Sequence, residues 1–303
     1  MPGSSDKFLT RALRLPADEV ILDLEDAVAP GAKDAARAAV ARAAAGDWGG
    51  RLLAVRINDA TSQWAYRDVI EVVERAGGRL DAIVLPKVSA PAHVAWLDLL
   101  LGQLEQVAGL PPGKIVIEAQ IEDAAGLAVV DAIAAGSSRL AALIFGPADF
   151  MASVGIRSLR IGGQPAGYAG GDAFHYPLLR ILVAARSAGL QAIDGPYSAI
   201  GDIDGLRGSA ASVAALGYDG KWVLHPDQIG PVNAAFSPDQ DQYDRAELIL
   251  DAYEYAATVQ RRGAVLLGDE MIDEASRKLA LVAAARGRAA GLARTSQFIP
   301  PAT

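Results

Sequence analysis

Two carboxylates close two separate apolar segments of this chain. Glu122 follows residues 115–121, and Asp149 follows residues 140–145 after the link Gly146-Pro147-Ala148. An acid at the end of a buried strand destabilises the fold unless its charge is compensated. Mg²⁺ can compensate it, because this ion takes oxygen ligands and uses only one or two protein carboxylates. The pair therefore predicts a Mg²⁺ site, with Mn²⁺ as a substitute ion; the alternative is a structural network with arginines.

Composition limits the classes of function. The chain has 303 residues, 51% of them hydrophobic, and a formal net charge of −8, which argues against nucleic acid or an anionic membrane as the partner. It contains no cysteine, which excludes disulfides, thiolate metal sites and a thiol nucleophile. No apolar stretch approaches the roughly 18 residues of a membrane-spanning helix. These features predict a cytoplasmic protein.

Short apolar segments alternate with helical patterns along the chain. The segments are apolar on both faces, which is typical of a parallel sheet covered by helices. The alternation itself predicts an α/β fold. We expect strands at residues 19–24, 52–57, 82–85, 115–121, 140–145, 191–193 and 222–224. We expect helices between them at residues 34–45, 63–75, 92–107, 124–134, 177–188 and 209–216.

A (β/α)8 TIM barrel requires one more strand than these seven. The opening Met1-Pro2-Gly3-Ser4-Ser5 has the character of a loop that follows a strand, so we expect the first strand to be truncated. An open doubly wound sheet is the alternative. In a barrel the carboxyl ends of the strands meet at one face and form the active site. Polar residues at or after strand ends favour the barrel, namely Asp23, Glu25, Asp26, Arg56, Lys87, Glu122, Asp149, Asp194 and His225.

The pattern changes after the last expected strand. A polar connection at residues 236–241 leads to two expected helices, at residues 243–261 and 274–291. We therefore divide the chain into a catalytic barrel at residues 1–238 and a helical lid with a tail at residues 239–303.

Several motifs, in this order, resemble the citrate lyase β-subunit and malyl-CoA lyase family of the HpcH/HpaI aldolase superfamily. The resemblance covers roughly residues 2–275, and it is closer to the malyl-CoA lyases than to the citryl-CoA enzymes. The motifs are Pro2-Gly3-Ser4, residues 21–28 (ILDLEDAV), 55–58 (VRIN), 85–88 (LPKV), 121–122 (IE), 145–149 (FGPAD), 192–197 (AIDGPY), 217–226 (GYDGKWVLHP) and 233–236 (NAAF).

The resemblance implies a Mg²⁺-dependent acyl-CoA lyase that assembles as a homo-oligomer, a trimer or hexamer, with a lid shared between subunits. Such enzymes cleave a 3-hydroxyacyl-CoA, for example L-malyl-CoA, β-methylmalyl-CoA or citramalyl-CoA. The products are an acyl-CoA and a small keto acid, glyoxylate or pyruvate. The reaction is a retro-Claisen cleavage, which also runs as a condensation.

The resemblance also implies roles for individual residues. Glu122 and Asp149 match the metal ligands of the family, and the metal that they bind positions the keto acid. Arg56 matches an active-site arginine able to stabilise the enolate that develops during cleavage. Asp273 matches a lid aspartate, given by a neighbouring subunit, that moves a proton at the acyl carbon. Asp23, Glu25 and Asp26 are expected around the metal site, where the last two match acids that hold metal-bound waters.

Further residues are expected to bind the substrate. The CoA phosphates require positive charge at the barrel mouth, for which Lys7, Arg11 and Lys87 are candidates. Backbone groups at Gly146 and Ala148 are candidates for the substrate carboxylate, whereas Pro147 has no N–H to donate.

Each assignment has an alternative. Arg56 could simply neutralise Asp23 or Glu25, and Asp273 lies in an acidic run where Glu274 replaces the proline usual in the family. At the level of function, the alternatives are a citryl-CoA lyase, a 2-keto acid aldolase without a CoA site, and a non-catalytic subunit that binds acyl-CoA.

Overall fold

The structure is a computed structural model that describes residues 15–299. The chain divides into two compact units, Met1–Val232 and Asn233–Thr303. The truncated first strand expected before Met1 and the candidates Lys7 and Arg11 lie outside the described residues. Among the described helices, none combines the length and hydropathy that a membrane crossing requires.

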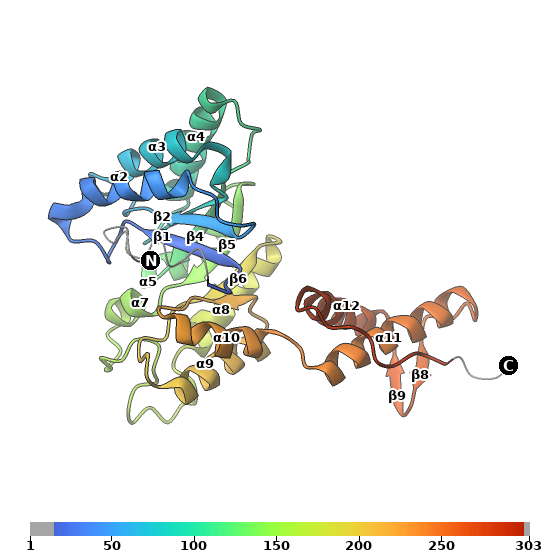
Figure 1. The fold of residues 1–303 in the computed structure, drawn as a ribbon. Coiled ribbons are helices and arrows are strands. Elements are labelled where there is room, and N and C mark those ends of the chain that lie inside the picture. Colours follow the sequence, from blue (N-terminus) through green and yellow to red (C-terminus); the bar gives the residue numbers. More distant parts are fainter. Residues whose placement is uncertain (1–14, 300–303) are drawn as a thin grey trace. The chain divides into compact units, whose positions relative to one another are not determined.

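The first unit contains a seven-stranded parallel sheet whose spatial order follows the sequence, from β1 to β7. Figure 1 labels β1, β2, β4, β5 and β6 of this sheet. The α/β fold and the seven parallel strands predicted from the sequence are confirmed. The strands are β1 (Glu19–Asp23), β2 (Leu52–Arg56), β3 (Ala82–Leu85), β4 (Val116–Ile121), β5 (Leu140–Phe145), β6 (Gln191–Asp194) and β7 (Gly220–Lys221).

Helices connect these strands. Capping residues begin and end them. Asp202 caps the N-terminus of α9 (Ile203–Leu216) by accepting a hydrogen bond from the amide of Gly205 at 3.0 Å. Gly109, in the left-handed region at φ 66°, ends α4 (Pro91–Ala108). The elements are η1 (Pro30–Ala32), α2 (Lys33–Ala44), α3 (Ala65–Ala76), η2 (Gly77–Arg79), α4 (Pro91–Ala108), α5 (Ala124–Ala128), α6 (Val130–Ala134), α7 (Pro147–Val154), α8 (His175–Ser187), α9 (Ile203–Leu216), η3 (Pro226–Gln228) and α10 (Ile229–Phe236).

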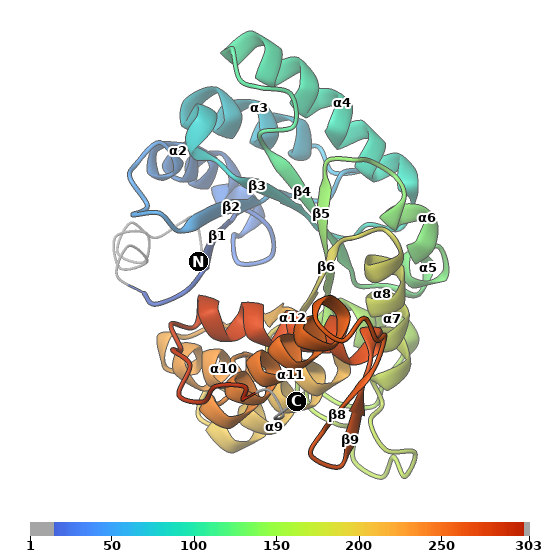
Figure 2. The same cartoon turned by 90° about the vertical axis from the view of Figure 1, so that its right-hand side faces the viewer.

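The sheet is curled, with α2, α3, α4, α6 and α8 on its convex side (Figure 2). Side chains from strands that are not neighbours in the sheet meet on the concave side. Arg56 at the end of β2 lies over the ring of Trp222, just after β7, at 5.4 Å. The same side holds a core cluster of Ala54, Ala82, Val84 and Ile144, against which Ile21, Val116, Ile193 and Trp222 pack. This inward curvature is TIM-like.

The structure corrects several element boundaries. The last strand of the sheet is Gly220–Lys221 rather than residues 222–224, because Trp222 already turns into the core cluster. The helix expected at residues 124–134 is two short helices joined at Val129. Helices α7 and α10 were not predicted, since each has only eight residues and begins close to a strand or a short 3₁₀ turn.

The concave side also contains a buried pair of acids. Glu19 of β1 and Glu118 of β4 are hydrogen-bonded to each other, although these strands are not adjacent in the sheet. Burial raises the pKa of Glu19 to about 7, with a further increase from Asp81, and the bond to Glu118 only partly opposes it. Burial and the neighbouring Glu19 also raise the pKa of Glu118. Asp81 in turn pairs with Lys114 at 3.0 Å.

Replacing Glu118 with glutamine is expected to flatten the pH dependence of stability. Burial and the neighbouring Glu19 raise the folded-state pKa of Glu118 above its usual 4.5, so the native state binds a proton here that the unfolded chain releases. Glutamine at this position removes that titration. The contribution of this buried pair to the free energy of unfolding should therefore be fully present below pH 4.5 and be lost as the pH rises to about 7, whereas acids with a lowered pKa, such as Asp23, contribute in the opposite direction. Urea unfolding of the wild type and of Glu118→Gln at several pH values measures the difference in stability between them, and a difference that is constant across the range would contradict the prediction.

The second unit pairs two helices with a hairpin: α11 (Gln240–Thr258), β8 (Val265–Leu267), β9 (Glu270–Ile272) and α12 (Glu274–Ala289). Tyr243, Ala246, Ala280 and Ala284 form its core. The two helices agree with those expected for this part of the chain. The hairpin was not predicted, because its strands have only three residues each around the turn at Gly268, where φ is +69°.

Candidate active site

An acidic loop after β1 lies beside the end of β2. Arg56 binds Asp23 with two hydrogen bonds, Nε to Oδ1 at 2.8 Å and Nη2 to Oδ2 at 2.7 Å. Its Nη1 also pairs with Glu25 Oε2 at 3.1 Å. Because Asp23 and Arg56 are directly opposite in the parallel register of β1 and β2, the sheet itself holds this pair. The predicted neighbourhood of Arg56, Asp23 and Glu25 is therefore present.

Burial and charge act against each other at these groups. Burial opposes ionisation of Asp23, but the hydrogen bonds and charge of Arg56 outweigh it and lower the pKa of this carboxyl. Burial raises the pKa of Glu25, although Arg56 and Lys87 partly counteract it. At Glu25 the desolvation therefore outweighs the attraction of the two cations that contact it.

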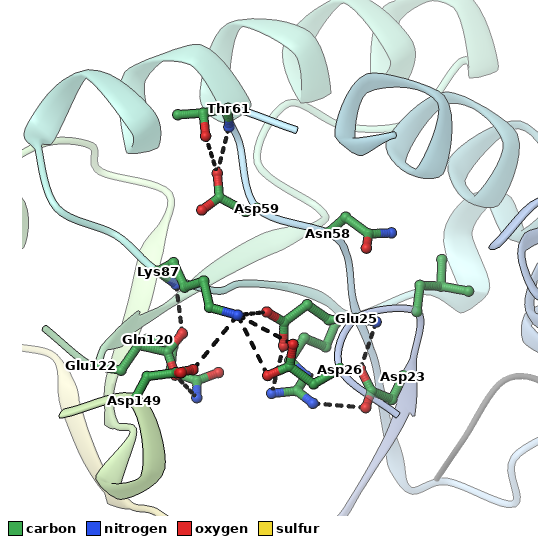
Figure 3. Close-up of polar contacts among 12 residues, drawn as sticks. Asp23, Glu25, Asp26, Asn58, Asp59, Thr61, Lys87, Gln120, Glu122 and Asp149 are labelled. Atoms are coloured by element: carbon green, nitrogen blue, oxygen red, sulfur yellow. Dashed lines mark hydrogen bonds and ion pairs between the residues drawn. The ribbon is translucent and has the colours of Figure 1, made fainter. Parts of the chain in front are cut away.

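Lys87, just after β3, contacts both predicted metal ligands (Figure 3). Its backbone N–H donates to Glu122 Oε1 at 2.7 Å, and its Nζ lies 3.6 Å from Asp149 Oδ2. The same ammonium binds Glu25 and pairs with Asp26 at 3.3 Å. Lys87 has a φ of +53°, a left-handed conformation that is uncommon for a residue with a side chain and is typical of functional sites.

Glu122 is buried at the end of β4, with only 3% of its surface exposed. Gln120, two residues earlier on the same face of the strand, donates from Nε2 to Glu122 Oε2 at 2.7 Å. A Cβ at Gly146 would lie 2.4 Å from the Cβ of Glu122, so the site requires glycine there. Burial raises the pKa of Glu122 to about 8, despite the Lys87 N–H, and the charges of Glu25 and Asp149 add to the increase.

Asp149 lies in the first turn of α7. This helix begins at Pro147, directly after its N-cap residue Gly146. Its side chain is partly exposed at 41%, so it is open to solvent and to a ligand. Ala148 beside it is exposed. Gly146, Ala148, Glu122 and Asp149 are therefore all at the carboxyl ends of β4 and β5, as the sequence predicts.

The donor set fits a hard divalent cation. Five carboxyl groups gather here: Asp23, Glu25, Asp26, Glu122 and Asp149. They outnumber the two cations that contact them, Arg56 and Lys87, even when the nearby ammonium of Lys33 is included. In residues 15–299 no three histidine, aspartate or glutamate side chains are arranged to hold an ion by themselves. Mg²⁺ tolerates such a sparse set, since it keeps waters and takes substrate oxygens as further ligands.

Two contributors to this site were not predicted. Gln120 could have been found from the period of two along a strand, which places it on the face of Glu122. Lys33, the first residue of α2, is buried and donates from Nζ to the carbonyls of Leu24 and Glu25, both at 2.8 Å. It thereby fixes the backbone of the acidic loop, a role that only the fold reveals.

Asp273 lies in the second unit, where it caps α12. Its Oδ1 accepts from the amides of Ala275 at 2.9 Å and Ser276 at 3.0 Å. The hydrogen bond from the Ser276 amide lowers the pKa of Asp273, so the group is a carboxylate at neutral pH. The structure thus shows a capping role, and the proton-transfer role stays a prediction.

Exchanging Asp273 for asparagine separates these two roles. Asparagine caps helices about as well as aspartate, so the melting temperature of the asparagine variant should equal that of the wild type, whereas the alanine variant should melt at a lower temperature. If Asp273 also moves a proton, the asparagine variant should lose about 10²–10⁴-fold in kcat while it still binds CoA and Mg²⁺. An unchanged rate would remove Asp273 from the mechanism.

A separate cavity of about 500 Å³ opens beneath the glycine-rich loop that precedes α8. Its walls include Phe145, Phe174 and the buried ion pair of Asp194 with Lys221, but none of the five clustered acids. Phe145 and Asp194 are one residue from Ile144 and Ile193 of the inner core, so they point to the opposite face of the sheet. The charged cluster, rather than this cavity, is the candidate active site.

Comparison with known proteins agrees with this geometry. The family model of HpcH/HpaI aldolase/citrate lyase matches residues 1–226, and the chain belongs to this family. It is 39% identical, over 93% of its length and 91% of the relative, to L-malyl-CoA/β-methylmalyl-CoA lyase of Cereibacter sphaeroides. It is 32% identical to citrate lyase subunit beta of Escherichia coli, over 90% and 86% of the two chains. The predicted family, nearer to the malyl-CoA lyases, is confirmed.

Solved structures show the same fold. Protein CitE from Mycobacterium tuberculosis, in complex with magnesium, acetoacetate and coenzyme A, matches with a TM-score of 0.75 and 28% identity. This match covers 95% of the present chain and 96% of CitE. A citrate lyase from Burkholderia xenovorans matches with a TM-score of 0.81 over 97% and 92% of the chains; at 23% identity it supports the fold alone.

Proposed function

We propose that this protein is a Mg²⁺-dependent carbon–carbon lyase that cleaves a 3-hydroxyacyl-CoA to an acyl-CoA and glyoxylate or pyruvate. L-Malyl-CoA, β-methylmalyl-CoA and citramalyl-CoA are the proposed substrates. One observation carries the proposal: Glu122 and Asp149 project from neighbouring strand ends into a cluster in which carboxyl groups outnumber the cations that contact them. The names of the relatives, and the magnesium and coenzyme A bound by CitE, support it.

Glu122 and Asp149 would hold the ion, with Glu25 and Asp26 beside it. When bound, Mg²⁺ would polarise the carbonyl of the keto acid as a Lewis acid. Cleavage removes the proton of the 3-hydroxyl group, breaks the bond between carbons 2 and 3, and moves its electron pair into the thioester as an enolate. A proton then returns to carbon 2 of the acyl-CoA, the step for which Asp273 of a neighbouring subunit is proposed.

Arg56 is suited to the enolate. A guanidinium has five N–H donors in a fixed plane, and the contacts with Asp23 and Glu25 engage only part of them. Those acids and the ring of Trp222 fix its position. A donor that is already oriented stabilises developing charge without reorganising during the reaction.

We also propose how the fold closes and which further residues bind the substrate. The sheet closes as a (β/α)8 barrel over residues 1–238, and residues 239–303 act as a lid shared within a trimer or hexamer. Lys7 and Arg11 bind the CoA phosphates, with Lys87 as a further candidate. Gly146 and Ala148 bind the substrate carboxylate, and Mn²⁺ substitutes for Mg²⁺. The protein acts in the cytoplasm, with no nucleic acid or membrane as a partner.

A panel of substrates tests the function. Purified protein is incubated with malyl-, β-methylmalyl-, citramalyl- and citryl-CoA and with the matching CoA-free acids, with Mg²⁺ and with EDTA. Cleavage of a malyl-type thioester that EDTA abolishes is the expected result. Cleavage of citryl-CoA alone, of CoA-free acids, or of no compound would instead support a citryl-CoA lyase, a keto acid aldolase or a non-catalytic subunit, respectively.

A further inference from the structure

Lys87 is the cation that contacts the most acids of the site. Its ammonium contacts Glu25 and Asp26 from the β1 loop and Asp149 from α7 (Figure 3). Its own amide holds Glu122. A single residue therefore contacts both candidate metal ligands, one through the backbone and the other through the side chain.

The backbone conformation of Lys87 explains this double contact. A φ of +53° is strained for a residue with a Cβ, and such strain persists only where surrounding contacts compensate it. Here the compensating contacts are those of the amide with Glu122 and of the ammonium with the acids. The lysine side chain is only 30% exposed, so the interaction is partly shielded from solvent.

We infer that the Lys87 ammonium is the internal counter-cation of the metal-free site, and that a divalent cation displaces it from Asp149. This inference rests on the proposed function, since it takes Glu122 and Asp149 as the metal ligands. Positive charge among these acids stabilises the free protein, and Lys87 supplies part of it beside Arg56. The contact at 3.6 Å with Asp149 is the longest of its ion pairs here, which makes it the one most easily exchanged.

Exchange has a consequence for affinity. A Mg²⁺ ion that enters the site must compete with the ammonium for Asp149. The observed affinity for Mg²⁺ is therefore lower than it would be if the acids in contact with Lys87 (Glu25, Asp26, Glu122 and Asp149) had no ammonium among them. The ammonium keeps Glu25 and Asp26 as partners after it leaves Asp149, so Lys87 need not become exposed. Lys87 thereby sets the concentration of Mg²⁺ at which the site fills.

The test replaces Lys87 with methionine, which removes the charge but keeps a Cβ and the amide that holds Glu122. Melting temperature and calorimetric titration are measured with Mg²⁺ alone, in the absence of substrate. We expect the variant without Mg²⁺ to melt below the wild type, because the acids lose one of the two cations that pair with them. Mg²⁺ should then raise its melting temperature more than that of the wild type, and its Kd for Mg²⁺ should fall by about tenfold.

Lys221→Met is the matched control. Lys221 also pairs with an aspartate, Asp194, but it is more deeply buried than Lys87 and lies on the opposite face of the sheet. This variant should melt at a lower temperature, and Mg²⁺ should raise its melting temperature by no more than that of the wild type. Lys87→Gln gives a second neutral side chain at the same position, for use if the methionine variant does not fold.

Three outcomes would overturn the inference. If the Lys87 variants bind Mg²⁺ as the wild type does, or more weakly, the ammonium does not compete with the ion. If a separate calorimetric titration with CoA shows that they lose affinity for CoA while their Kd for Mg²⁺ equals that of the wild type, Lys87 is a phosphate ligand. If the wild type itself shows no effect of Mg²⁺ on binding or melting, the proposed metal site is wrong and this inference fails with it.

Discussion

Substitution of Asp149 by alanine is expected to reduce Mg²⁺-dependent turnover by at least about a thousandfold. This loss corresponds to about 4 kcal/mol of transition-state stabilisation, which is the scale of a Lewis acid in a shielded site. Stability should change little, because the carboxylate is partly exposed and its ion pair with Lys87 spans 3.6 Å. Initial rates at saturating Mg²⁺ and the melting temperature measure both effects.

Asp131→Ala serves as the control for Asp149. Asp131 is a more exposed carboxylate that pairs with Arg180 at 2.9 Å on the outer helices of the same unit. Its loss should leave turnover intact. Full activity of the Asp149 variant, with Mg²⁺ still required, would show that the ion is held elsewhere.

Replacement of Arg56 by methionine is expected to lower kcat by about 10²–10³-fold, the loss typical for one donor to a developing oxyanion. It should also destabilise the fold by about 3–5 kcal/mol, since Asp23 keeps its buried charge without its partner. The assay must therefore run well below the melting temperature of the variant. Stopped-flow or steady-state rates measure the loss of kcat, and denaturant unfolding measures the loss of stability.

Arg139 provides a close match for Arg56. Its side chain is similarly buried and binds two acids, Asp98 at 2.9 Å and Glu105 at 2.7 Å. Arg139→Met should therefore lose comparable stability without a specific loss of kcat. If Arg56→Met keeps wild-type kcat at a temperature where both variants are folded, Arg56 has only the structural role of neutralising Asp23 and Glu25.

Much of the candidate site could be predicted from the order of strands. Glu122 and Asp149 follow apolar segments, and in a parallel sheet the carboxyl ends of neighbouring strands lie side by side. Their shared location, and that of Arg56 beside Asp23, therefore follows from the pattern alone. The predicted strands are confirmed in number and direction, because strands apolar on both faces and linked by helices have few alternatives to a parallel sheet.

Contacts that depend on local backbone geometry could not be predicted in this way. The left-handed backbone conformation of Lys87, which allows this residue to contact both Glu122 and Asp149, cannot be recognised from the residue pattern. The same holds for Lys33, whose bonds to two carbonyls depend on how α2 packs against the acidic loop. The hairpin before α12 was missed because strands of three residues carry no measurable periodicity.

The sequence by itself determined the class of fold, the family and the acids at the ends of β4 and β5. These properties depend on which residues are apolar and in what order, and that information is local. Only the tertiary structure decided how the charges are shared, namely that Arg56 is held by Asp23 and Glu25 while Lys87 contacts both candidate ligands. Electrostatic pairing depends on distances between segments far apart in the chain and on their burial, which exist only once the sheet has formed.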